Sequence, residues 1–208
     1  LAARFDRETS KLPKTGHVRL QVESKLLTAF QGQHRRVSSK PNTQTKLEQL
    51  ATMQHFGCPT RLLDWSRSAW VSLYFSCEKH HEPPPGGADS QHHDGELWVF
   101  RCDQLRAGLK HKAALQSDWT QELVEETVFS PKASRLIFPL NPIEKFERLP
   151  KAAKQRILAQ EGRFTIAADP SEDHEKLLAS LVLAPAIGGS PCLKRIRFPR
   201  EIKPALLR

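Results

Sequence analysis

The sequence contains few cysteines and no long apolar run. None of the four cysteines among its 208 residues belongs to a C-x-x-C pair, which excludes a zinc-ribbon pattern. No stretch approaches the roughly 20 apolar residues of a membrane-spanning helix. Residues 1–20 carry charges throughout, so we also expect no secretory segment. We therefore expect a cytoplasmic protein with reduced thiols and no membrane partner.

The sequence also lacks the glycine-rich loops that cradle phosphates, since neither G-x-G-x-x-G nor G-x-x-x-x-G-K-[ST] occurs. Its net charge is nevertheless +9. Residues 1–50 contain ten basic and four acidic residues, and residues 151–208 contain eleven and six. Residues 51–100 are net acidic, with three and six. If the two basic ends meet in space, this distribution favours an anionic partner, such as a nucleotide or nucleic acid. An ordinary solvated surface is the alternative.

Helix and strand patterns follow each other without a regular βαβ order, which predicts an α+β fold with a mixed, split β-sheet and flanking helices. The clearest helix covers residues 46–56, where Thr45 and Glu48 form a capping-box pattern. A second, apolar helix is predicted over residues 68–77, with Trp70 in the core. Strands are predicted at or near residues 60–64, 95–101, 136–138, 164–166 and 193–199.

Two polar segments, residues 34–45 and 78–94, are predicted to be loops because they have little apolar content to anchor them. The second contains three prolines, two glycines and two histidine pairs, at residues 80–81 and 92–93. Neutral imidazoles are good zinc or copper ligands. Neighbouring side chains in a loop point apart, however, and no rigid scaffold supports these pairs. We therefore predict no metal site.

The most unusual segment is residues 54–68, which places many hydrogen-bonding side chains between the two predicted helices. Arg61 and Asp64 form a structural ion pair in one interpretation, and Ser66 or Ser68 caps the second helix. One cap does not account for the remaining polar groups, so a ligand site is the other interpretation. The candidate contacts in this segment are His55, Thr60, Arg61, Asp64, Trp65 and Ser66.

Residues 54–66, Q-H-F-G-C-P-T-R-L-L-D-W-S, closely resemble the signature of the FRG domain family. Two further elements follow the family order: F-Q-G-Q at residues 30–33, and R-I-L-A-Q-E-G-R-F-T at residues 156–165. Together they predict an N-terminal arm or helix over residues 1–27. An FRG-like domain would then cover residues 28–208, with residues 78–94 as a surface insertion.

FRG domains in turn resemble the ADP-ribosyltransferase fold, which implies a site that holds NAD and cleaves its nicotinamide–ribose bond. That chemistry needs a carboxylate to steady the ribose as positive charge develops. The resemblance implies an ADP-ribosyltransferase-like or NAD-cleaving enzyme, in the setting of a toxin or defence effector, with a nucleic acid, a protein or water as acceptor. The implied catalytic residues are Gln160, Glu161 and Asp64; the implied cofactor contacts are Gln31, Gly32, His55, Thr60, Arg61, Trp65 and Ser66.

One departure from the family pattern bears on this function. The first element has Gln31 where the family usually has arginine, and glutamine supplies no positive charge for a phosphate. Arg35 or Arg36 are the candidate replacements. A non-catalytic nucleotide- or nucleic-acid-binding module is therefore the alternative function. A structural interaction domain, in which the Arg61–Asp64 pair only locks the fold, is a third.

Overall fold

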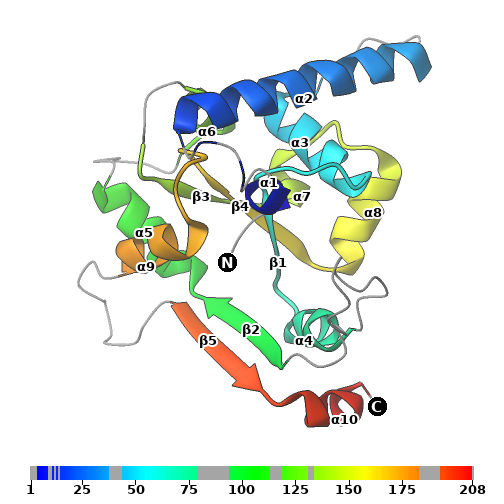
Figure 1. Ribbon diagram of the computed structural model, residues 1–208, viewed down its shortest axis with the longest axis vertical. Helices are drawn as coiled ribbons and strands as arrows, with labels where there is room; N and C mark the ends of the chain where they lie inside the picture. The colour runs from blue at the N-terminus through cyan, green and yellow to red at the C-terminus, as the bar shows by residue number, and fades with distance from the viewer. Residues whose placement is uncertain are drawn as a thin grey trace.

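A computed structural model shows a mixed α+β fold in which helices flank two small antiparallel sheets (Figure 1). The structure describes residues 4–8, 11, 13, 15–37, 44–78, 94–112, 119–130, 134–182 and 193–207. The histidine pairs and nearly all of the predicted insertion over residues 78–94 lie outside these ranges, as do the side chains of Arg35 and Arg36.

One sheet has three strands in the order β1-β4-β3, and the other pairs β2 with β5. The strands are β1 Leu63–Ser66, β2 Gly95–Phe100, β3 Ile137–Leu140, β4 Gly162–Ala167 and β5 Leu193–Phe198. The longer helices are α2 Gly16–Val37, α3 Lys46–His55, α4 Ala69–Cys77, α5 Cys102–Lys112, α6 Gln121–Val128, α8 Lys151–Ala159 and α9 His174–Val182. The short ones are α1 Arg4–Glu8, α7 Pro142–Lys145 and α10 Lys203–Leu206, the last preceded by a 3₁₀ turn at Arg200–Ile202.

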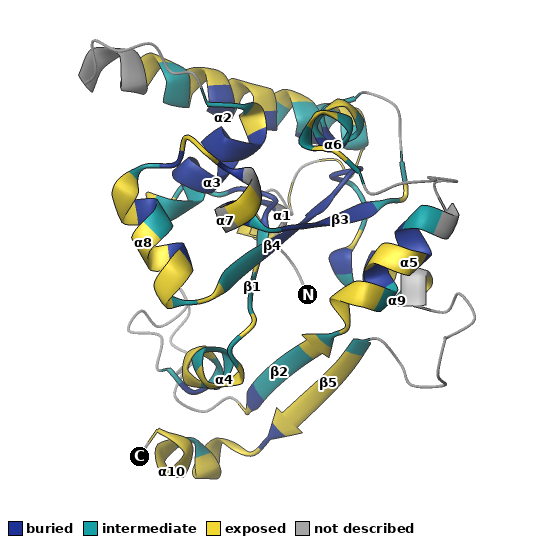
Figure 2. Cartoon of the chain, turned by 180° about the vertical axis from the view of Figure 1, so that it is seen from behind, coloured by how far each residue is buried: buried dark blue, intermediate teal, exposed yellow. Residues whose placement is uncertain are grey.

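Helix α3 is deeply buried. It begins with the capping box that the sequence predicts. The Thr45 hydroxyl accepts a hydrogen bond from the Glu48 backbone N–H, and the Glu48 carboxylate accepts one from the Thr45 N–H. The other Glu48 oxygen accepts from the Arg148 N–H at 2.7 Å. Leu47 and Leu50 are fully buried in the core. Figure 2 shows buried residues along α3, β3 and β4, whereas β5 and α10 are largely exposed.

Arg61 lies in the core, where its guanidinium joins three parts of the fold. Its Nε donates to Glu23 Oε1 of α2 at 2.8 Å, and its Nη2 lies 2.8 Å from Glu23 Oε2. Nη1 donates to the carbonyls of Ala167 and Ala168 at the end of β4, and Nη2 donates to the Val128 carbonyl at the end of α6. The Arg61 side chain is 1% exposed. This network links α2, α6 and β4 to the segment that leads into β1.

Two local predictions differ from the structure. Residues 30–37 continue helix α2, so the F-Q-G-Q element is helical and the predicted loop at residue 34 does not begin there. Trp70 on α4 is 80% exposed rather than in the core. Its helix does begin as predicted, because the Ser68 hydroxyl accepts from the Val71 N–H.

No helix in the described ranges combines the length and apolarity needed to cross a membrane.

We predict that Arg61→Met lowers the free energy of unfolding by about 3–5 kcal/mol, because it leaves the Glu23 carboxylate buried without its partner. Urea denaturation measures the effect. Adding Glu23→Leu recovers part of the loss, since three carbonyls still lack their donor. The control is Arg101→Met in the exposed Arg101–Asp103 pair, which leaves stability nearly unchanged. An Arg61→Met variant as stable as the wild type contradicts this account of the core.

Candidate functional site

A pocket of about 600 Å³ runs along β1, the edge strand of the three-stranded sheet. This volume lies within the roughly 300–1,000 Å³ of typical small-molecule sites. Side chains from α3, β1, α4, β2, α8 and β4 line the pocket, and Arg7 of α1 reaches it as well. The pocket therefore joins parts of the chain that lie far apart in sequence.

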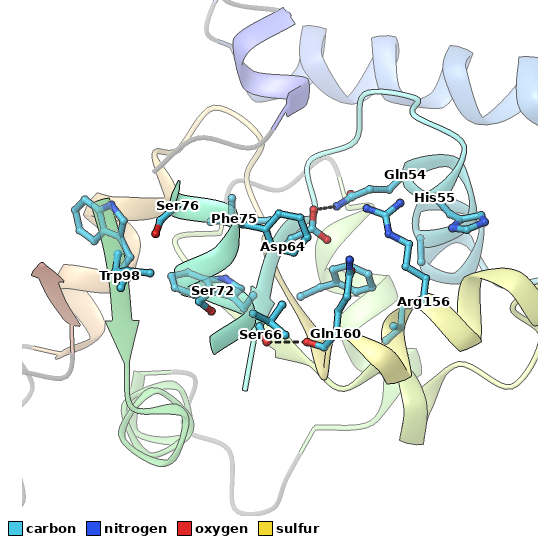
Figure 3. Close-up of a pocket in the computed structure, with 18 of the residues that line it drawn as sticks. Gln54, His55, Asp64, Ser66, Ser72, Phe75, Ser76, Trp98, Arg156 and Gln160 are labelled. Carbon is cyan, nitrogen blue, oxygen red and sulfur yellow. Dashed lines mark hydrogen bonds between the residues drawn. The ribbon is translucent and has the colours of Figure 1, made fainter. Parts of the chain in front are cut away.

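Asp64 projects into the middle of this pocket (Figure 3). Its Oδ2 accepts a hydrogen bond from Gln54 Nε2 at 2.6 Å. The Thr60 hydroxyl donates to Gln54 Oε1, which fixes the amide so that its NH₂ group faces the carboxylate. Thr60 is buried and does not line the pocket. A buried hydroxyl thus orients an amide, and the amide orients the carboxylate.

The pKa of Asp64 is raised above its ordinary value. The pocket walls desolvate the carboxylate, although its outer edge is open to solvent, and this desolvation is the largest cause. The hydrogen bond from Gln54 and the positive charge of Arg156 act in the opposite direction. A carboxylate with a raised pKa in a pocket is typical of functional sites.

The two sides of the pocket differ in chemistry (Figure 3). Gln54, His55 and Arg156 lie on one side of Asp64, and Phe75 and Trp98 lie with two serines on the other. The serines are Ser72 and Ser76. One wall is therefore polar and basic, and the other is aromatic with hydroxyl groups.

At the far end of the aromatic wall, Glu96 is held by its neighbours on β2 and β5. Its carboxylate accepts hydrogen bonds from Trp98 Nε1 and from Arg197 Nε. Desolvation acts to raise the pKa of Glu96, but these two bonds and the charges of Arg197 and Arg195 outweigh it and hold the pKa below its usual value. Arg195 also lies over the Trp98 ring, 5.3 Å from its centroid. Glu96 is thus held by two hydrogen-bond donors, and its pKa is shifted in the direction opposite to that of Asp64.

Residues 1–84 match the family model of the FRG domain. This match supports the FRG domain family for residues 1–84. The match covers α1 to α4 and β1, and therefore includes Asp64, Gln54 and the α4 wall of the pocket. Neither the curated proteins nor the solved structures that were compared include a match to this chain.

Five of the residues predicted as site residues lie on this pocket. Trp65 packs edge-on against Phe100 and donates its indole N–H to Thr165. Ser66 donates to the Gln160 carbonyl at 2.7 Å and accepts from the Ser68 N–H, so both its bonding roles are filled within the protein. The five are His55, Asp64, Trp65, Ser66 and Gln160.

The other five predicted site residues are placed elsewhere. Arg61 and Thr60 are buried beneath the site, and Arg61 pairs with Glu23 rather than Asp64. Gln31 lies within helix α2 and donates to Gln49 Oε1 at 2.9 Å, and the neighbouring Gly32 is exposed. Glu161 is exposed in the turn between α8 and β4, with a φ of 47°, and does not line the pocket.

Several residues of the pocket were not predicted from the sequence. Gln54 and Arg156 belong to the motifs at residues 54–66 and 156–165, and this position could have indicated that they are site residues. Phe75, Ser72 and Glu96 carried no such signal, because α4 and β2 come together only in the folded chain. Within the described residues, no group of three or more His, Cys, Asp or Glu side chains is arranged to hold a metal ion.

We predict that Asp64→Asn raises the melting temperature at pH 7. A carboxyl whose native pKa exceeds its unfolded pKa loses stability as the pH rises through the native value, so at neutral pH the ionised group costs stability. Asparagine keeps the oxygen that accepts from Gln54 and removes that cost. Thermal unfolding at several pH values measures the difference, which shrinks as the pH falls towards about 4, where an ordinary aspartate is also protonated. A variant less stable than the wild type at pH 7 contradicts the prediction.

Proposed function

We propose that the FRG domain binds NAD in the Asp64 pocket and cleaves the nicotinamide–ribose bond, as an ADP-ribosyltransferase-like or NAD-cleaving enzyme. The observation that carries the proposal is Asp64 itself, a carboxylate with a raised pKa held between an orienting amide and an aromatic wall. Of the carboxylates named from the sequence, Asp64 lines the pocket and Glu161 does not. Asp64 therefore takes the role of the catalytic carboxylate.

In this reaction the bond between ribose C1′ and the nicotinamide nitrogen breaks, and its electron pair leaves with the nitrogen, which neutralises the pyridinium charge. Positive charge develops on the ribose, and the Asp64 carboxylate stabilises it. Water or the hydroxyl or amine of an acceptor then attacks C1′ and loses a proton. Asp64 acts only when it is ionised, so the rate falls as the pH drops through its raised pKa.

Neighbouring residues support this placement of NAD. The Phe75 and Trp98 rings line the pocket, and an aromatic ring face can hold the nicotinamide. Gln160 lines the pocket at the end of α8 and would bond the ribose hydroxyls. Gln54 keeps a second amide N–H besides the one given to Asp64.

The experiment is a nicotinamide-release assay with NAD, in water and with panels of nucleic-acid and protein acceptors. Wild type is expected to release nicotinamide, and Asp64→Asn to lower the rate by about 100-fold or more, the cost of removing one preorganised electrostatic group. The matched control is Glu161→Gln, which also removes one carboxylate charge but lies off the pocket and keeps the wild-type rate. No release by the wild type with any acceptor refutes the enzymatic function.

A second candidate is a non-catalytic nucleic-acid-binding module, favoured by strand β5. Lys194, Arg195 and Arg197 are exposed along this strand. If β5 binds duplex DNA, the affinity falls with added salt, and Lys194→Gln makes the log–log slope shallower by about one. A fluorescence-anisotropy titration at several salt concentrations measures this slope. Binding that is absent or independent of salt rules out this candidate.

A further inference from the structure

A second hollow, of about 240 Å³, adjoins the Asp64 pocket on its basic side. The two hollows share Arg7, Gln54, Leu63, Asp64 and Arg156 as lining residues. Arg4 and Cys58 complete the polar lining of the smaller one. Because the lining is shared, one elongated ligand can occupy both hollows.

The smaller hollow depends on α1, which is fixed to the signature segment. Phe5 is fully buried, and its backbone N–H donates to the Thr60 carbonyl at 3.1 Å. Arg4 Nη1 donates to the Gly57 carbonyl at 2.8 Å. Arg4 and Arg7 are three residues apart on the helix, so they share one face. Docking of α1 therefore presents two arginines to the hollow, opposite Arg156 of α8.

The charge of the smaller hollow is positive. Three guanidinium groups line it, and among its described lining residues Asp64 is the single acid. Glu8 lies outside the lining, with its Oε1 3.6 Å from Arg4 Nε in an exposed pair. Such pairs contribute little, so an incoming anion can compete for Arg4. Guanidinium groups bind phosphate oxygens with two parallel hydrogen bonds, which lysine does not do.

We infer that Arg4, Arg7 and Arg156 form a subsite for a diphosphate group, next to the position of the ribose beside Asp64. The inference rests on the proposed function in that it places the diphosphate of NAD, but it needs no bond cleavage. Three arginines from two separate elements, around a hollow larger than one phosphate group, favour a diphosphate over a single phosphate. The subsite also brings together the two basic ends of the sequence, since α1 and α8 come from residues 1–50 and 151–208.

The test is isothermal titration calorimetry of the full chain with ADP, adenosine, pyrophosphate and inorganic phosphate. ADP and pyrophosphate are expected to bind, and adenosine and phosphate to bind much more weakly. Arg7→Gln and Arg156→Gln are each expected to weaken ADP binding by about tenfold or more, since each removes a charged donor of two parallel hydrogen bonds. Arg7→Lys restores only part of the affinity, because lysine lacks the two-donor geometry.

The matched control is Arg101→Gln, which removes one surface arginine that lies on neither hollow. It should bind ADP as the wild type does, and melting temperatures confirm that all variants are folded. ADP binding that weakens equally in the control, or ADP that binds no better than adenosine, overturns the subsite. Arginine-dependent ADP binding without nicotinamide release retains the subsite and refutes the chemistry assigned to Asp64. Nicotinamide release that Arg7→Gln and Arg156→Gln leave unchanged refutes the subsite and retains the chemistry assigned to Asp64.

Discussion

The Arg61–Glu23 ion pair is the interaction on which the arrangement of the site depends. Arg61 ties α2, the end of α6 and the end of β4 to the segment that enters β1. With the Arg61 side chain held in the core, the following residues form strand β1. Asp64, three residues after Arg61, lies on this strand and lines the pocket. Thr60, which precedes Arg61 and is also buried, donates a hydrogen bond to Gln54. This bond orients the Gln54 amide towards Asp64. The motif at residues 54–66 thus contains both Arg61, which holds the fold together, and Asp64, whose position depends on it.

This division of labour explains why the polar segment carries so many hydrogen-bonding groups. Arg61 and Thr60 are buried and support the fold, whereas Asp64 and His55 line the pocket. The exposed carboxylate is the group that costs stability when ionised, and the buried charge is the one that is fully paired. The raised pKa of Asp64 in a pocket with an aromatic wall supports the proposed ligand chemistry.

Local signals predicted much of the fold. The Thr45–Glu48 capping box set the start of α3, and alternation of side chains located β2 and β5. Burial of Arg61 was not predictable in the same way, because its partner Glu23 lies 38 residues earlier and the carbonyls it bonds come from other elements. The F-Q-G-Q element was assigned to a cofactor contact by resemblance, but helix α2 turns Gln31 towards Gln49. Arg7 joined the site only through the docking of Phe5, which no local pattern indicates.

In the proposed complex, one ligand lies across the Asp64 pocket and the arginine-lined hollow beside it. The most direct measurement is a crystal structure of the chain with ADP-ribose, the part of NAD that remains after nicotinamide leaves. We expect the ribose C1′ to lie against the Asp64 carboxylate and the diphosphate to lie among Arg4, Arg7 and Arg156. ADP-ribose bound on another face, or bound here in the opposite direction with its adenine beside Asp64, would contradict it.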